Sequence, residues 1–168
     1  MSKQAIVCDT TVLLYLGRIG QADLLSEFFS PICVPEPVML ELDMGRLLRS
    51  DTINPRNLAW ATPVSATQAV IDDLPPNRLG AGERAVIAYA RSRDGYVAGL
   101  DDLRARQLAE SVGLKVVGTM GTLLRAKRAG LIPAVRPLLD EVIMQGFRLN
   151  PELYRDVLAL AGEERGAG

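Results

Sequence analysis

Short apolar runs rich in β-branched residues alternate along this chain with longer stretches of helical periodicity. This alternation is typical of βαβ units, in which helices cross over the sheet between parallel strands. We predict strands near residues 4–8, 31–35, 58–63, 95–100 and 115–117. The sequence therefore favours an α/β fold with a central, mostly parallel sheet of four to five strands.

Helix starts and ends are marked between these strands by prolines in first turns, by glycines after last turns and by capping residues. We predict helices over or near residues 10–17, 24–29, 36–42, 82–91, 103–112, 119–130, 138–143 and from 151 onward. The segment around 85–90 is apolar nearly all round, so it should be buried. Residues 43–57 have little periodicity, and we expect a mobile loop or a helical arm there.

Length and composition exclude several classes of protein. The 168 residues fit one domain, which we expect over 1–162 with a flexible tail at 163–168. The chain has no histidine and two cysteines, Cys8 and Cys33, so Ser-His-Asp, Cys-His and unaided zinc sites are excluded. No apolar run is long enough to span a membrane, and Asp9 interrupts the first one too early for a signal peptide. We expect a cytoplasmic location.

Acidic residues recur where parallel strands and their following helices would bring them together. Asp9 ends the first strand, and Asp101 and Asp102 follow the fourth. Glu41 lies on the helix after the second strand, and Glu83 lies in the first turn of the helix after Gly82. Ligands in open α/β sheets bind outside the carboxyl ends of the strands. These five carboxylates are therefore our candidate catalytic and metal-ligating residues.

The physical case for a metal rests on repulsion, because carboxylates within about 4–6 Å of one another raise each other's pKa unless a cation intervenes. Mg²⁺ or Mn²⁺ supplies such a cation and prefers oxygen ligands. Either ion can lower the pKa of a bound water and stabilise charge on a phosphodiester. Each acid also has an ordinary role open to it. Asp9 and one of the Asp101-Asp102 pair can cap helices, and Glu41 and Glu83 can be a surface acid and a helix-dipole partner.

Hydroxyl and basic side chains near the predicted strand ends are candidates for substrate binding. Thr10 and Thr11 follow Asp9, and Thr119 follows the last short strand. Arg104 and Arg106 lie just after the Asp101-Asp102 pair and could contact backbone phosphates. Helix capping and a solvated helix face are the alternatives for these residues. The net charge of −1 and pI of about 5.5 argue against broad, salt-driven wrapping of nucleic acid.

Four motifs, in this order and spacing, resemble those of a PIN-domain protein. They are the stretches 7–14 (VCDTTVLL), 34–42 (VPEPVMLEL), 79–88 (LGAGERAVIA) and 99–109 (GLDDLRARQLA). The stretch from Val117 to Tyr154 is also similar to the predicted nucleic-acid-binding branch (DUF3368-like), which is related to VapC-type toxin ribonucleases.

The resemblance implies a PIN-like three-layer α/β/α sandwich and a metal-dependent ribonuclease using Mg²⁺ or Mn²⁺. Asp9, Glu41, Glu83 and one of Asp101 or Asp102 would form the acidic pocket. Water activated by the metal would attack the backbone of an RNA substrate and leave a 5′-phosphate. The resemblance also implies a toxin of a toxin–antitoxin pair, silenced by a small antitoxin protein, and a homodimer. The apolar segments around Leu13-Leu14 and Leu24-Leu25 are candidates for the dimer face.

Other classes fit the sequence less well. A haloacid-dehalogenase-type hydrolase needs an aspartate two residues after the nucleophile, where this chain has Thr11. A receiver domain needs its acidic pair near the first strand, whereas the pair here follows the fourth. The serious alternative is a non-catalytic or weakly active RNA- or protein-binding module of the same fold, since the same residues would hold a metal in either case.

Overall fold

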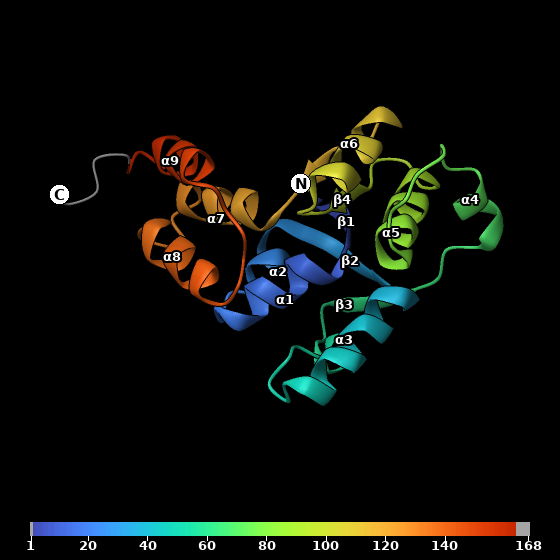
Figure 1. The fold of residues 1–168 in the computed structure, drawn as a ribbon, viewed down its shortest axis with the longest axis horizontal. Coiled ribbons are helices and arrows are strands. Elements are labelled where there is room, and N and C mark those ends of the chain that lie inside the picture. Colours follow the sequence, from blue (N-terminus) through green and yellow to red (C-terminus); the bar gives the residue numbers. More distant parts are fainter. Residues whose placement is uncertain (1, 164–168) are drawn as a thin grey trace.

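A five-stranded, all-parallel sheet lies at the centre of the computed structural model, which describes residues 2–163 (Figure 1). The strands lie in the order β3-β2-β1-β4-β5. Their bounds are β1 Gln4–Cys8, β2 Phe29–Pro35, β3 Ala61–Val64, β4 Val97–Gly99 and β5 Val116–Val117. The predicted α/β class with a parallel central sheet is confirmed.

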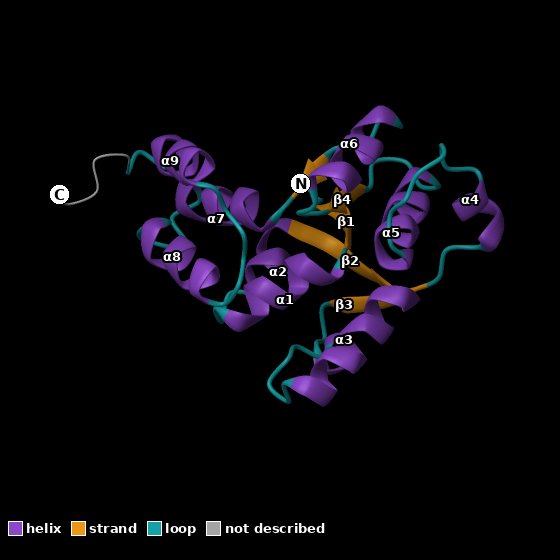
Figure 2. Cartoon of the chain, in the orientation of Figure 1, coloured by secondary structure: helices purple, strands orange, loops and turns teal. Residues whose placement is uncertain are grey.

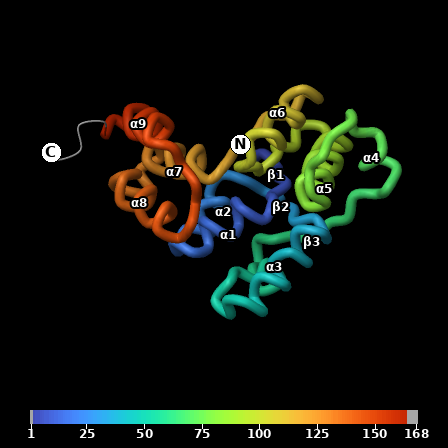
Figure 3. The backbone as a smooth tube through the Cα atoms, viewed as in Figure 1, coloured from blue at the N-terminus to red at the C-terminus, as the bar shows by residue number. Residues whose placement is uncertain are grey.

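Helices flank this sheet (Figure 2). They are α1 Thr10–Arg18, α2 Leu24–Phe28, α3 Glu36–Leu48, α4 Gln68–Asp72, α5 Ala81–Arg91, α6 Leu103–Ser111, α7 Thr119–Arg128, α8 Arg136–Met144 and α9 Pro151–Leu160, with a 3₁₀ turn η1 at Pro55–Asn57. Helix α1 packs against α3, and α5 packs against α6 and against β1, β2 and β4. Helices α7, α8 and α9 gather at one end of the molecule, and α4 lies at the other (Figure 3).

The order of the strands sets the position of the site. From β1 the chain proceeds to β2 and β3 on one side, and it later returns to place β4 on the other side of β1. The carboxyl ends of β1 and β4 therefore form the switch point at which ligands bind in open parallel sheets. Gly99 permits the close approach of these strands, since a Cβ there would lie 3.2 Å from the Cα atom of Cys8.

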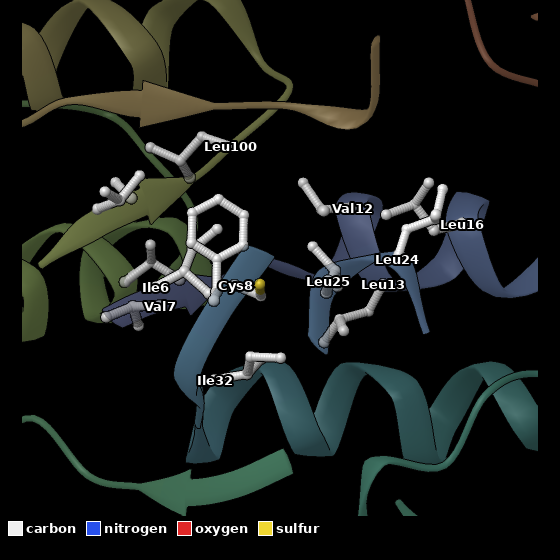
Figure 4. Packing of buried hydrophobic residues seen from close by; sticks show 14 of the residues in the cluster. Ile6, Val7, Cys8, Val12, Leu13, Leu16, Leu24, Leu25, Ile32 and Leu100 are labelled. Carbon is white, nitrogen blue, oxygen red and sulfur yellow. The ribbon is translucent and has the colours of Figure 1, made fainter. Parts of the chain in front are cut away.

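The core consists of aliphatic side chains from β1, β2 and β4 and from the helices that cover them. Figure 4 shows Ile6, Val12 and Leu100 in this cluster, all of them fully buried. The apolar segment of α5 is buried as predicted, because Val86 and Ile87 are inaccessible to solvent. Its burial fixes α5 against the sheet and therefore fixes the first turn of α5 beside the ends of β1 and β4.

The structure differs from the sequence prediction at β3 and α4. Strand β3 begins at Ala61 rather than near residue 58. Helix α4 was not predicted; none of its residues is buried, so its sequence has no clear apolar face. Within 43–57, the helical arm is correct up to Leu48, where α3 ends. This extension is held by Asp43, which forms ion pairs with Arg46 on α3 and with Arg56 in η1.

Most of the predicted dimer face lies in the core. Leu13, Leu24 and Leu25 are buried there, where the amphipathic faces of α1 and α2 turn toward the sheet. Leu14 is half-buried, and the homodimer itself stays a prediction. The exposed large apolar side chains of α3 are instead Leu40, Met44, Leu47 and Leu48.

The chain is ordered one residue further than the predicted domain end. Glu163 accepts hydrogen bonds from the Val135 and Arg136 amides at 2.8 and 3.0 Å and from Lys127 Nζ at 2.9 Å. It therefore ties α9 to the start of α8. The rest of the predicted tail, 164–168, lies outside the described residues. Within residues 2–163, no helix combines the length and apolarity that crossing a membrane requires.

Candidate acidic active site

Asp9 is the single residue between β1 and α1, at the switch point of the sheet. Its amide donates to the Gly99 carbonyl at 2.9 Å, which ties the end of β1 to the end of β4. Asp9 occupies the N-cap position of α1, yet its carboxylate makes no capping hydrogen bond. Only 5% of the residue is exposed. The capping role that the sequence left open is therefore not realised.

Glu41 approaches Asp9 from α3. The Thr10 hydroxyl donates to Glu41 Oε2 at 2.6 Å, so the residue after Asp9 orients the glutamate. A Cβ atom at Gly82 would lie 2.7 Å from Glu41 Oε1 and 3.2 Å from Asp9 Oδ1. Two carboxylates from β1 and α3 thus meet at one glycine on the first turn of α5, although the sequence separates all three.

Glu83 follows that glycine and faces the same cluster. One of its carboxylate oxygens accepts a hydrogen bond from the Gly80 amide at 3.3 Å, so it does help to begin α5. Burial raises the pKa of Glu83, and repulsion from Asp102 and Glu41 raises it further. The capping role and a place in the acidic cluster are therefore both realised by this side chain.

Asp101 and Asp102, which the sequence could not tell apart, have different environments. Asp102 is exposed and caps α6, since its Oδ2 accepts from the Ala105 amide at 3.0 Å. Asp101 is turned inward, where its two oxygens accept from the Thr119 amide and the Thr119 hydroxyl, each at 2.7 Å. Asp101 therefore fixes the first residue of α7, and Thr119 begins that helix rather than capping it.

The candidate substrate-binding residues are divided between surface and interior. Arg104 is exposed at the start of α6. Arg106 is half-buried and donates to the Leu100 carbonyl at 3.3 Å. Thr119 is fully buried, so it positions Asp101 and is not available to a substrate. The buried hydroxyl of Thr11 has no partner with the geometry of a hydrogen bond, although it lies close enough to Asp101 to lower the pKa of that carboxyl.

Electrostatic repulsion is concentrated on Asp9. Burial raises its pKa to about 7; repulsion from Glu83, Glu41 and Asp101 adds to the rise, while the Thr10 amide opposes it. Burial also raises the pKa of Asp101, and it raises that of Cys8, where Asp9 adds to the effect. The Cys8 thiol therefore stays protonated and is not a nucleophile.

The acidic cluster fits a divalent cation in its donor chemistry. Across residues 2–163, no three carboxylate or thiol side chains lie close enough, as they are oriented, to ligate one ion together. Mg²⁺, however, commonly takes only one or two protein carboxylates and keeps several waters. Asp9 and Glu41 provide such a pair, because both carboxylates converge on Gly82. Glu83 is a further candidate donor, because its charge raises the pKa of Asp9 and its own pKa is raised by Glu41.

The raised pKa of Asp9 predicts the pH dependence of the metal-free protein. An acid whose folded-state pKa exceeds its unfolded value destabilises the fold as pH rises between the two values. In EDTA we expect the unfolding free energy to fall by roughly 2–4 kcal/mol between about pH 4 and pH 7, and then to level off. Urea unfolding at a series of pH values measures this, and stability that rises over the same interval would contradict it.

Gly118, like Gly82, lies where a side chain would clash with residues of the site. A Cβ there would lie 2.6 Å from Asp101 Oδ1 and 3.0 Å from the Leu100 carbonyl oxygen. Because Leu100 is fully buried and the half-buried Asp101 is held by Thr119, we expect Gly118→Ala to lower the unfolding free energy by roughly 1–3 kcal/mol. The matched control is Gly121→Ala on α7, where the nearest atom is at 3.8 Å. Equal urea midpoints for the two variants would contradict the expectation.

Gly82 and Gly118 are the residues that the sequence analysis missed. Both stand in glycine-containing turns beside an acidic motif, but glycines there are equally explained by ordinary turn and capping requirements. A glycine is needed at these positions because a carboxylate from another element lies against the backbone. That contact cannot be predicted from the neighbouring sequence.

Comparison with known proteins gives one match. A family model described as a PIN domain (DUF3368) matches residues 5–163. Neither the comparison with curated proteins nor that with solved structures finds a match that reaches significance.

Proposed function

The chain belongs to the PIN-domain family, and from that premise we propose that it is a metal-dependent ribonuclease that hydrolyses RNA phosphodiester bonds. PIN domains are generally nucleases, and the fold is nuclease-like. The observation that carries the proposal is the meeting of Asp9 and Glu41 at Gly82, with Asp9 buried and uncapped. A buried carboxylate with a second carboxylate beside it is unfavourable for folding, and a cation bound in function would offset that cost.

Asp9 and Glu41, with Glu83 beside them, are the residues that would hold Mg²⁺ or Mn²⁺. When bound, the ion neutralises this cluster, activates water and stabilises charge on the phosphodiester. The chain's own residues prepare the site: Thr10 holds Glu41 in orientation. Thr119 in turn holds Asp101. Arg104, exposed beside this edge, is the proposed contact to the RNA backbone.

Removal of the metal tests the proposal directly. We expect purified protein to cleave a structured RNA in Mn²⁺ or Mg²⁺ and to lose at least about 100-fold of that rate in EDTA, because the acidic cluster then repels the phosphate. Restoring Mn²⁺ in excess should restore the rate. Gel analysis of end-labelled RNA measures both. Cleavage that persists unchanged in EDTA would contradict a carboxylate–metal nuclease.

The binding-module alternative has a distinct outcome in the same assay. Folded protein that binds Mn²⁺ and retains RNA without cutting it would favour a non-catalytic RNA-binding role. The engagement of Asp101 with Thr119 supports keeping this alternative, since it leaves fewer free carboxylates at the site.

The proposed toxin role, the antitoxin, the homodimer and the cytoplasmic location rest on the family resemblance and on the composition of the chain. Growth arrest on expression, relieved by a small co-expressed protein, is the measurement that tests the first two. Light scattering of the purified protein tests the homodimer.

A further inference from the structure

A pocket of about 360 Å³ lies beside the acidic cluster, between α4, the segment that follows it and the first turn of α5. Its lining includes Pro37 and Ala81. Pro37 is one helical turn before Glu41 on α3, and Ala81 precedes Gly82 on α5. The pocket is therefore the continuation of the same α3–α5 seam in which Asp9 and Glu41 meet.

The guanidinium of Arg84 lines this pocket and forms no ion pair within residues 2–163. Its Nε atom is buried and has no hydrogen-bond partner. No ion pair joins it to an acid among the described residues, whereas Arg46, Arg49, Arg56 and Arg91 all have such pairs. Burying part of a guanidinium without an acceptor is costly. A ligand that presents acceptors to Arg84 would remove that cost.

The other lining residues combine apolar side chains with polar groups. Ile71, Leu74 and Pro75 line the pocket. Asn77 is fixed by hydrogen bonds to the Pro75 carbonyl at 2.9 Å and from the Leu79 amide at 3.1 Å, so this wall is already ordered. A pocket that joins apolar walls to fixed polar groups suits a ligand with an apolar face and a polar edge.

The charge of the wall disfavours a phosphate as occupant. Asp72 also lines the pocket, and its Oδ1 accepts a hydrogen bond from neutral Gln68 at 2.8 Å rather than from a cation. A phosphate would therefore face an uncompensated carboxylate. A nucleobase carries no charge, and it can present acceptors on one edge to a guanidinium and donors on another to a carboxylate.

We propose that this pocket binds a nucleobase of the RNA strand that crosses the acidic cluster, and that Arg84 selects guanine. The proposal rests on the ribonuclease function proposed above. A guanidinium donates two parallel hydrogen bonds to the O6 and N7 acceptors of guanine, while adenine presents a donor in place of O6. Arg84 is thereby a specificity-determining residue, distinct from the carboxylates that hold the metal.

Binding of nucleoside monophosphates in EDTA tests the pocket without requiring catalysis. Guanosine, adenosine, cytidine and uridine 5′-monophosphates and inorganic phosphate are titrated into isotope-labelled protein and followed by amide NMR. We expect guanosine monophosphate to shift amides of residues 68–77 and 81–84 and to bind at least 10-fold more tightly than the other four probes. We expect Arg84→Gln to lose at least 10-fold of that affinity, whereas Arg155→Gln, which removes one exposed charge on α9, should lose none.

A second variant keeps the test decisive if Arg84→Gln fails to fold. Ala81→Leu retains every charge and places a larger side chain at the pocket wall, so it should also reduce guanosine monophosphate binding at least 10-fold. Equal affinity for the four nucleotides, or shifts reproduced by inorganic phosphate, would overturn the proposal. Guanine-selective binding by a protein that never cleaves RNA would leave the pocket standing and refute the nuclease. Metal-dependent cleavage without nucleotide binding at residues 68–84 would support the nuclease and refute the pocket.

Discussion

We expect Asp9→Asn to lower the rate of metal-dependent RNA cleavage at least about 100-fold. We also expect the metal-free variant to be at least as stable as the wild type. The loss of cleavage is the largest functional effect that we expect from a single substitution. Asp9 is buried, its carboxylate caps no helix and its pKa is raised to about 7. Asparagine has nearly the same shape but no charge, so above pH 7 it removes both the repulsion and the principal metal ligand.

Two measurements separate these effects. Mn²⁺ affinity, measured by calorimetry, should fall at least 10-fold in Asp9→Asn, and the urea midpoint in EDTA at pH 8 should stay or rise. At pH 4, where the wild-type carboxyl is largely protonated, the two stabilities should converge. A large loss of stability in metal-free Asp9→Asn at pH 8 would show that Asp9 does not lie in a repulsive cluster.

Gly82→Ala should remove most of the activity without removing the fold. The new Cβ would lie 2.7 Å from Glu41 Oε1, which is closer than nonbonded carbon and oxygen atoms tolerate, and 3.2 Å from Asp9 Oδ1. Glu41 is an exposed side chain, so it can swing away at little cost to stability. Displacing it breaks the carboxylate pair. We expect cleavage to fall by roughly 10–100-fold, as for loss of an orienting contact at a metal site.

The unfolding free energy of Gly82→Ala should rise, because alanine is favoured over glycine inside a helix by about 1 kcal/mol. Gly45→Ala on α3 is the matched control. It makes the same change in helix propensity, but the new Cβ atom would lie 3.5 Å from its nearest neighbour, Thr52 Cγ2, which is an ordinary van der Waals contact. Activity in the Gly45 variant should equal that of the wild type. If both variants retained full cleavage, Gly82 would be excluded as the meeting point of the catalytic carboxylates.

Much of the site was predictable because it follows from local rules. A strand that ends at Cys8 and a helix that begins at Thr10 leave Asp9 at the sheet edge, and the pattern around residues 95–103 does the same for Asp101 and Asp102. Glu41 and Glu83 could be assigned to helices from the prolines and glycines before them. The placement of a dimer face could not be predicted in the same way. An apolar run such as Leu24-Leu25 looks the same whether it faces the core or a partner.

The sequence by itself determined the order of strands and helices and the acidic residues at their ends, because periodicity, capping and turn residues act over a few neighbouring positions. Only the tertiary structure decided that Asp101 turns inward to Thr119 while Asp102 caps α6. It also decided that Gly82 leaves room for Asp9 and Glu41, and that Arg84 faces a pocket without a partner. These contacts join segments far apart in the chain, and their distances depend on how α3, α5 and α7 pack around the sheet.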